Sequence, residues 1–279
     1  MEKYNLLPQQ LLYEGTINSN NLFSPQPMDE SIILLTHDAA YLKKLNSLEL
    51  SAAEVRKTGF PLTKELIERE KIIMQGTLES AKYAIQYGVS GNIAGGTHHA
   101  FADRGEGFCL LNDIAIAANY LLKNQISKKI LVVDLDVHQG NGTASIFNGT
   151  QNVFTFSMHG ENNYPLKKEK SDLDVPLLDG INDKEYLSLL KQHLPFLMEQ
   201  ESPDFIFYQC GVDILATDKL GRLGVSLDGC RERDCFVFEQ AKKNKIPICF
   251  CMGGGYSEKI SVIIEAHANT YRVAQEIFF

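Results

Sequence analysis

The stretch Ile130–Gly142, I-L-V-V-D-L-D-V-H-Q-G-N-G, decides how the rest of the chain is interpreted. Its first four residues are apolar or β-branched, which is typical of a buried strand in a parallel sheet. Asp134, Asp136 and His138 follow at alternate positions, so they share one face of an extended chain. Carboxylate and imidazole groups together are zinc ligands. The stretch predicts a buried strand that ends in a metal site, although these polar residues could instead cap the following turn.

The composition is that of an ordinary globular protein: 44% of the 279 residues are hydrophobic and 22% are charged. A net charge of -8 at pH 7 argues against a non-specific nucleic-acid partner. We find no apolar run of the ~18 residues that a membrane span requires, and no signal-peptide pattern. The six cysteines form no C-x-x-C pair, which favours reduced thiols. We therefore expect a cytoplasmic protein with no membrane partner.

Strand-like and helix-like segments alternate along most of the chain, which predicts an α/β fold of three layers. In this fold a largely parallel sheet is covered by helices on both faces, and we expect a single domain over residues 1–279. Residues 1–28 are polar and turn-rich, so no helix or strand is expected there. Further strands are expected at about 89–94, 152–158, 205–210 and 246–252. Helices are expected at about 31–45, 63–87, 112–123, 143–147, 183–200 and 228–244, and a last helix follows the final strand and runs to residue 279.

Polar residues follow each predicted strand. Because parallel strands place their carboxyl ends along one edge of a sheet, the loops that carry these residues should meet. The residues are His98 and His99, the Asp134/Asp136/His138 set, His159, Asp213, and Gly253–Tyr256.

A metal site can be assembled from these loops. Asp136, His138 and Asp213 would supply three ligands and leave positions open, as catalytic zinc sites do. The pair His98–His99 would then provide a general base and an electrostatic partner beside the metal.

Three further side chains complete this chemistry. Asp134 and Asn141 could orient the two histidines. Tyr256, which follows three glycines, offers a phenol donor to a developing oxyanion. The residues themselves thus predict metal-assisted hydrolysis of an amide or an ester.

Five motifs now support a family resemblance: G-G-T-H-H, G-F-C, V-D-L-D-V-H-Q-G-N-G, Q-C-G-V-D-I-L and G-G-G-Y. Together they resemble the metal-dependent histone deacetylase family, which has an arginase-like α/β fold. The resemblance runs from about Ser31 to the C-terminus, with the motifs in family order. The forms H-Q-G-N-G, D-R-G-E-G-F-C and D-I-L-A-T-D-K-L-G-R-L-G are most similar to the class IV branch and its bacterial relatives.

The resemblance implies a zinc-dependent hydrolase that removes acetyl or longer acyl groups from N-ε-acyl-lysine in a protein or peptide. It implies Zn²⁺, or Fe²⁺ in its place, on the three ligands named above. His99 would be the general base and then the acid, His98 would support the transition state, and Tyr256 would polarise the scissile carbonyl.

The resemblance also implies roles for residues outside this centre. The expected substrate-binding residues are Gly107, Phe108, Tyr164, Leu220 and Gly254. A structural K⁺ is expected on Asp134, Asp136, His138, Ser157 and Met158, and a second K⁺ near Phe147, Thr150 and Val153.

The sequence departs from the family at three places, one of which is the acidic loop residue that relatives use to hold the substrate backbone and that has no identifiable counterpart here. Many relatives carry His and Asp where this chain has Gln139 and Asn141, and a neutral Asn cannot raise the pKa of His99 as a carboxylate would. The usual opening segment of the family, with its His-Pro sequence, is missing, and in the family that segment supplies an edge strand and part of the channel wall.

Two other functions fit the same sequence. An acetylpolyamine amidohydrolase would act on a small acylated amine with the same scaffold, and a non-catalytic module would bind acyl-lysine without cleaving it. A ureohydrolase would need further Asp and His ligands for a two-manganese site, and the sequence does not offer them.

Overall fold

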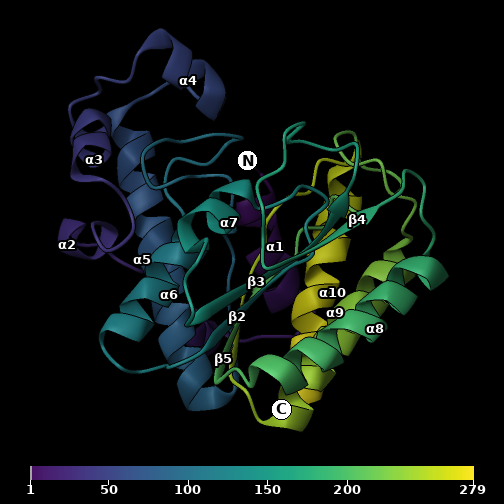
Figure 1. The fold of residues 1–279 in the computed structure, drawn as a ribbon. Helices are drawn as coiled ribbons and strands as arrows, with labels where there is room; N and C mark the ends of the chain where they lie inside the picture. Colours follow the sequence, from purple (N-terminus) through teal and green to yellow (C-terminus); the bar gives the residue numbers. More distant parts are fainter. Residues whose placement is uncertain (1) are drawn as a thin grey trace.

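The computed structural model describes residues 2–279 and contains a six-stranded sheet in which every neighbouring pair of strands is parallel (Figure 1). The strand order is β1-β6-β5-β2-β3-β4. This confirms the predicted α/β fold with a parallel sheet. The strands are β1 (Val89–Asn92), β2 (Ile130–Asp134), β3 (Val153–Gly160), β4 (Leu173–Leu177), β5 (Phe205–Gln209) and β6 (Ile248–Cys251).

Helices cover both faces of this sheet, as Figure 1 shows. The first face carries α2 (Glu30–Ile33), α3 (Ala39–Asn46), α5 (Lys64–Tyr87) and α6 (Asp113–Lys123), and the second carries α8 (Asp183–Glu201), α9 (Leu227–Asn244) and α10 (Ile260–Phe278). The remaining helices are α1 (Lys3–Tyr13), α4 (Ala52–Thr58), α7 (Asn141–Phe147) and the short 3₁₀ helix η1 (Ser19–Asn21).

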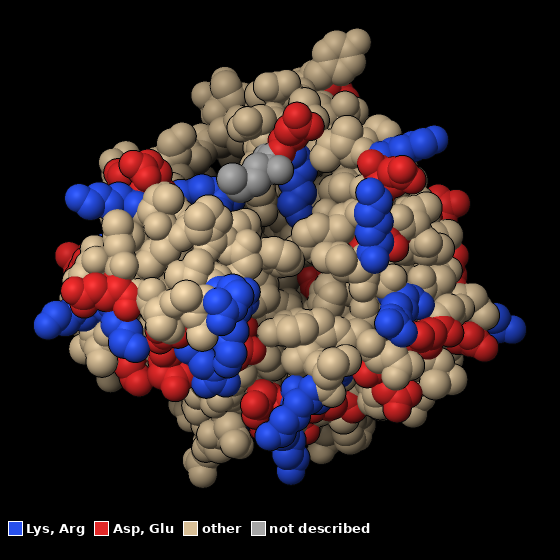
Figure 2. All heavy atoms as spheres, turned by 90° about the horizontal axis from the view of Figure 1, so that it is seen from above, with Lys and Arg blue, Asp and Glu red and all other residues tan. Residues whose placement is uncertain are grey.

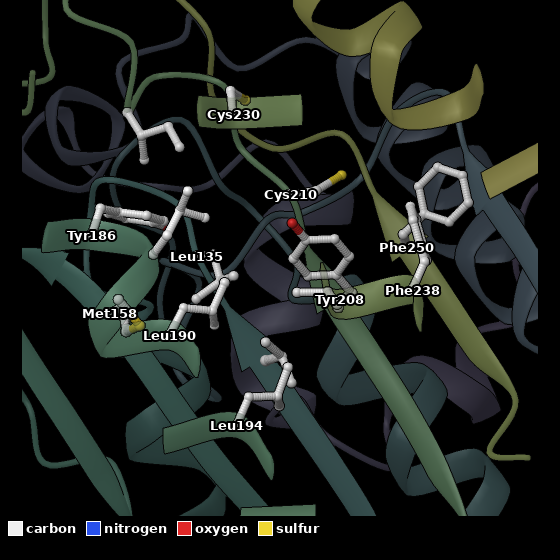
Figure 3. Close-up of a cluster of buried hydrophobic side chains, with 14 of the residues drawn as sticks. Leu135, Met158, Tyr186, Leu190, Leu194, Tyr208, Cys210, Cys230, Phe238 and Phe250 are labelled. Carbon is white, nitrogen blue, oxygen red and sulfur yellow. The ribbon is translucent and has the colours of Figure 1, made fainter. Parts of the chain in front are cut away.

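The central strand β2 is buried on both sides, as its unbroken apolar run predicts. Leu131 and Val133 face the core beneath α8, α9 and α10, while Ile130 and Val132 face the core beneath α5 and α6. Figure 3 shows part of the first of these cores, with Tyr208 and Phe238 among its side chains. Burying each large apolar side chain stabilises the fold by roughly 1.5–3 kcal/mol, so β2 is held firmly between the two layers.

The long helix α5 begins and ends where the sequence predicts. Thr63 caps it, because its hydroxyl accepts a hydrogen bond from the Leu66 amide at 3.1 Å. Gly88 ends it with a φ of 91°, a conformation that favours glycine. The strand β1 follows at once, so α5 fixes where the loop after β1 starts.

The expectation of an irregular segment over residues 1–28 is wrong for its first part, because Lys3–Tyr13 form helix α1. Leu7 and Leu11 are fully buried, and they pack with Ile264 and Ala268 of α10. The sequence of this helix contains Leu6, Leu7, Leu11 and Leu12, but Pro8 in its interior argues against a helix. The surface that stabilises α1 lies at the other end of the chain.

The single helix expected over 31–45 is divided in two. Between α2 and α3, His37 turns inward, where its Nε2 accepts a hydrogen bond from the Asn112 amide at 2.9 Å. The amide of Asp38 donates to the carbonyl of Ala102 at 2.9 Å. Apolar spacing along 31–45 continues across this break, so periodicity alone does not reveal it.

The sequence also gave no indication of strand β4. It pairs only with β3, at the edge of the sheet. Pro176 lies within it, and proline is tolerated in a strand chiefly at such an edge. Five residues with a proline carry too weak a pattern to be recognised as a strand.

No helix in residues 2–279 has the length and hydropathy needed to cross a membrane.

Candidate active site

The loops that follow β1, β2, β5 and β6 meet at the carboxyl edge of the sheet, as predicted. Backbone amides connect them: Val137 donates to Oδ1 of Asp213 at 3.0 Å, and Gly254 donates to Oδ2 of Asp136 at 2.9 Å. Figure 2 shows the molecule from above, and this face is hollowed near its middle, with acidic atoms visible inside the hollow. Four separate loops therefore form one polar centre.

Asp136, His138 and Asp213 form the core of this centre. All three side chains are buried, and one ligand atom of each lies within 4.8 Å of the others. Nδ1 of His138 lies 3.1 Å from Oδ1 of Asp136 and 3.1 Å from Oδ2 of Asp213. Burial disfavours protonation of this ring, yet hydrogen bonds to the two carboxylates raise the pKa of His138 to about 10. A divalent cation would displace a proton held there.

The local structure fits such a cation. Oδ2 of Asp213 is buried, and apart from its 3.1 Å contact with Nδ1 of His138 it has no hydrogen-bond partner, an arrangement that a positive ligand would complete. Gly211 and Gly254 leave room beside the carboxylates, since a Cβ at either position would collide with Asp136 or Asp213. Two carboxylates and one imidazole are suitable ligands for Zn²⁺ or Fe²⁺.

The first histidine of the pair, His98, is paired with a carboxylate. Its Nδ1 lies 2.7 Å from Oδ2 of Asp134, the last residue of β2, and both side chains are buried. Although burial disfavours the charged ring, the carboxylates of Asp134 and Asp136 raise the pKa of His98 to about 9. The carboxylate of Asp134 thus favours the protonated form of the His98 ring.

The second histidine, His99, is paired with a neutral amide. Its Nδ1 donates to Oδ1 of Asn141 at 2.7 Å, which leaves Nε2 as the nitrogen with a free lone pair. Burial, together with the charges of His98 and His138, holds the pKa of His99 well below its usual range. Its ring is therefore neutral at pH 7 and can accept a proton.

One residue that holds this pair was not anticipated from the sequence. Asp113, in the first turn of α6, is fully buried. Its carboxylate accepts hydrogen bonds from the amides of Gly96 and Thr97, at 3.0 and 2.8 Å, and from the hydroxyl of Thr77 at 2.6 Å. It thereby fixes the backbone that leads into His98. An Asp directly after the capping residue of a helix looks like ordinary charge–dipole stabilisation.

Tyr256 lies at the end of the glycine loop that follows β6. Its amide donates to Asp218 at 2.6 Å. Burial and the carboxylates of Asp213 and Asp136 raise the pKa of its phenol, so the hydroxyl stays protonated and can donate. Lys3 of α1 lies 5.6 Å over the ring and donates from Nζ to the carbonyl of Gly253 at 3.1 Å. No pattern in the sequence places Lys3 in the site.

Two of the expected substrate-binding residues, Gly107 and Tyr164, lie around His99, and a third, Phe108, lies near Tyr256. A Cβ at Gly107, whose φ is 54°, would come within 2.7 Å of the His99 ring. The ring of Tyr164 stands edge-on to His99 with 5.0 Å between centroids. Phe108 is 46% exposed, with its ring centroid 6.3 Å from that of Tyr256. These residues form an aromatic wall beside the polar centre.

The other two expected substrate-binding residues lie in different places. Gly254 is in the centre itself, hydrogen bonded to Asp136. Leu220 is exposed, and its carbonyl accepts a hydrogen bond from Asn163 at 2.7 Å, next to Tyr164. The side chain of Asn163 therefore connects the Leu220 loop to the segment that carries Tyr164.

The residues expected to bind K⁺ lie on the neighbouring ends of β2 and β3. Asp134 is directly opposite Ser157 in the sheet register. For the second site, the amide of Thr150 donates to the carbonyl of Phe147 at 2.8 Å, just before β3. Both K⁺ sites stay predictions.

His159 had been grouped with the strand ends, but it lies within β3. Its Nδ1 is 2.9 Å from the Ser157 hydroxyl, so its hydrogen-bond partner belongs to its own strand. Burial lowers the pKa of His159 to about 4.

Comparisons with known proteins agree with this arrangement. The histone deacetylase domain family matches residues 1–271. An uncharacterised protein of Picosynechococcus sp. is 38% identical over 278 residues, which cover 100% of this chain and 93% of that protein. Histone deacetylase 2 of Arabidopsis thaliana is 30% identical over 269 residues, or 91% of this chain and 68% of that protein. The crystal structure of an HDAC homologue complexed with SAHA is similar with a TM-score of 0.84 at 26% identity, covering 97% of this chain and 77% of that one.

The parallel sheet and the buried Asp-His-Asp group at its carboxyl edge place this protein in the class of hydrolases with the deacetylase fold. The chain belongs to the histone deacetylase family. The family resemblance is thereby confirmed, while the similarity to the class IV branch stays a prediction.

Proposed function

We propose that this protein is a metal-dependent hydrolase that removes acyl groups, acetyl or longer, from the ε-amino group of acyl-lysine, within one domain over residues 1–279. The observation that carries the proposal is the placement of two histidines, one paired with a carboxylate and one with an amide, beside the Asp136/His138/Asp213 group. A divalent metal bound by these three residues would polarise the substrate carbonyl and lower the pKa of a bound water.

In this proposal the two histidines have different roles. His99 accepts a proton at Nε2 from the attacking water and then donates it to the leaving amine, because its Nδ1 is already committed to Asn141. His98, kept positive by Asp134, stabilises the negative charge that develops on the carbonyl oxygen. Their different partners support this division.

Tyr256 would donate a hydrogen bond from its hydroxyl to the carbonyl oxygen of the substrate. The side chains of Phe108 and Tyr164 would line the path of the acyl-lysine side chain, with Gly107 leaving room beside His99. An apolar path of this kind excludes water from the lysine stem and carries the acyl group to the metal.

The test is hydrolysis of acetyl-lysine and myristoyl-lysine peptides and of an acetylpolyamine by protein loaded with Zn²⁺ or Fe²⁺, with metal content measured in parallel. We expect cleavage of a lysine substrate, and a fall of about 10²-fold or more in kcat for Tyr256→Phe. Tyr13→Phe is the matched control, because Tyr13 is 91% exposed, and it should keep full activity.

The outcomes separate the alternatives. Cleavage confined to the acetylpolyamine would assign the protein to that class of amidohydrolase. Binding of acyl-lysine without cleavage of any substrate would make it a binding module, and the proposed deacylase activity would then be wrong.

A further inference from the structure

Arg233 of α9 is an arginine with no exposed surface, placed behind the metal centre. Its nearest counter-ion is the adjacent Asp234, with Nε and Nη2 at 2.9 and 2.8 Å from Oδ1. Asp234 also accepts hydrogen bonds from the hydroxyls of Tyr208 and Thr270. The ion pair is therefore completely enclosed by the helices α9 and α10 and the strand β5.

The rest of the guanidinium is used on three backbone carbonyls. Nη1 donates to Gly211 at 2.6 Å and to Leu135 at 3.3 Å, and Nη2 donates to Cys210 at 3.2 Å. Leu135 immediately precedes the ligand Asp136. Cys210 and Gly211 lie in the short turn that leads from β5 to the ligand Asp213. One side chain thus contacts both of the segments that carry the carboxylate ligands.

Stability alone does not explain a buried ion pair. The free-energy cost of removing two charges from water usually equals or exceeds the gain from their mutual attraction. The planar fork of arginine offers five donors in fixed directions, and a lysine ammonium cannot reach the same set of acceptors at once. At Arg233 those directions match one carboxylate and three carbonyls. The guanidinium is therefore suited to hold these two chain segments at a fixed spacing.

We propose that Arg233 is a positioning residue that sets the spacing of Asp136 and Asp213 through the backbone, and so determines the affinity of the site for a divalent metal. The inference rests on the metal-site assignment and is independent of the acyl substrate. A carboxylate pair displaced by a few tenths of an ångström binds metal more weakly, as happens when groups supporting metal ligands are removed.

The experiment compares the Zn²⁺ dissociation constants of the wild type and of Arg233→Lys by competition with a chromogenic chelator. We expect Arg233→Lys to bind Zn²⁺ about 10- to 100-fold more weakly. Arg231→Lys is the matched control, because Arg231 lies on the same helix but makes only an exposed ion pair with Glu276 at 2.8 Å. It should keep the wild-type affinity.

A second variant guards against simple misfolding. Arg233→Met combined with Asp234→Leu removes both charges together, so no buried charge is left unpaired. We expect this folded variant also to bind Zn²⁺ weakly. If folded Arg233 variants bind Zn²⁺ as tightly as the wild type and differ only in the melting temperature of the metal-free protein, Arg233 is structural and the inference is wrong. Failure of the wild type to bind any divalent metal would instead overturn the metal site itself.

Discussion

Asn141 lies in the first turn of α7, with its side-chain oxygen 2.7 Å from Nδ1 of His99. The preceding residue, His98, has the carboxylate of Asp134 beside the same ring nitrogen, Nδ1. The carboxylate raises the pKa of His98, whereas burial lowers the pKa of His99 and the neutral amide does not offset it. The two rings therefore differ in their readiness to hold a proton.

Replacing Asn141 with Asp should shift the acidic limb of the kcat/KM pH profile upward by about one unit. The added carboxylate favours the protonated form of His99, so a higher pH is needed to free the base. The measurement is the pH profile of both proteins on the same acyl-lysine peptide. Asn148→Asp makes the same chemical change at the exposed end of α7 and should leave the profile unchanged. An unmoved limb in Asn141→Asp would contradict the role given to His99.

At the scale of an element, α1 contributes to the site although it comes from the opposite end of the sequence. Its apolar residues pack on α10, and this places Lys3 under the loop that carries Tyr256. Burial lowers the pKa of Lys3, while Asp213, Asp136 and Asp218 act to raise it. The helix thus supplies a cation that fixes the Gly253 carbonyl.

Lys3→Met should lower kcat by about 10-fold, since it keeps the apolar stem but removes the hydrogen bond that orients the Tyr256 loop. The dissociation constant for Zn²⁺ should change little, because the metal ligands belong to other loops. Steady-state kinetics on an acyl-lysine peptide and chelator competition make the two measurements. Lys43→Met, on the exposed side of α3, serves as the control. An unchanged kcat in Lys3→Met would exclude a role for α1 in the site.

Helix α5 carries an unusual group, the buried carboxylate of Glu70. One of its oxygens pairs with Arg69 at 3.1 Å, and the other has no hydrogen-bond partner. Burial raises the pKa of Glu70 to about 7, above its ordinary value of 4.5. The folded protein therefore binds a proton more tightly here than the unfolded chain does, and its stability decreases as the pH rises from about 4.5 to about 7.

Glu70→Gln should remove this cost, because the amide is neutral at every pH. We expect the variant to be more stable than the wild type by about 1–3 kcal/mol at pH 8 and nearly equal to it at pH 4.5. Urea unfolding at the two pH values measures the difference. Glu68→Gln, two residues away and exposed, should show no such pH-dependent gain. Equal stability of Glu70→Gln and the wild type at pH 8 would mean that the buried carboxylate does not lower the free energy of unfolding.

At the scale of the whole molecule, the Asp136/His138/Asp213 group joins the loops that follow β2 and β5, two neighbouring strands of one sheet. A ligand that binds only the folded state adds stability by mass action, about 2.7 kcal/mol at a concentration 100 times its dissociation constant. A metal bound at this site should therefore stabilise the loops at the carboxyl edge of the sheet.

We expect excess Zn²⁺ to raise the melting temperature of the wild type, and a chelator to reverse the increase. Asp213→Asn should lose most of this increase, because a charged ligand becomes a neutral one. Asp179→Asn changes an exposed residue in a surface ion pair with Arg222 and should respond to Zn²⁺ as the wild type does. Calorimetry of the three proteins with and without metal gives the comparison, and an equal response of Asp213→Asn would place the metal elsewhere.

The sequence by itself determined the parallel sheet, most of its strands and the loops that bear Asp136, His138, Asp213 and Tyr256. These features are local, because a run of apolar β-branched residues followed by polar ones marks the end of a buried strand within about ten residues. Parallel topology then brings such ends together without any knowledge of side-chain contacts.

Only the tertiary structure decided the features that depend on partners distant in the chain. Lys3 meets Gly253 across 250 positions and Arg233 meets Leu135 across 98. The break at His37 and the edge strand β4 likewise depend on segments that pack against them. Their patterns in the sequence are weak because their stabilising contacts are long-range, and no local periodicity records which distant residue will complete a hydrogen bond.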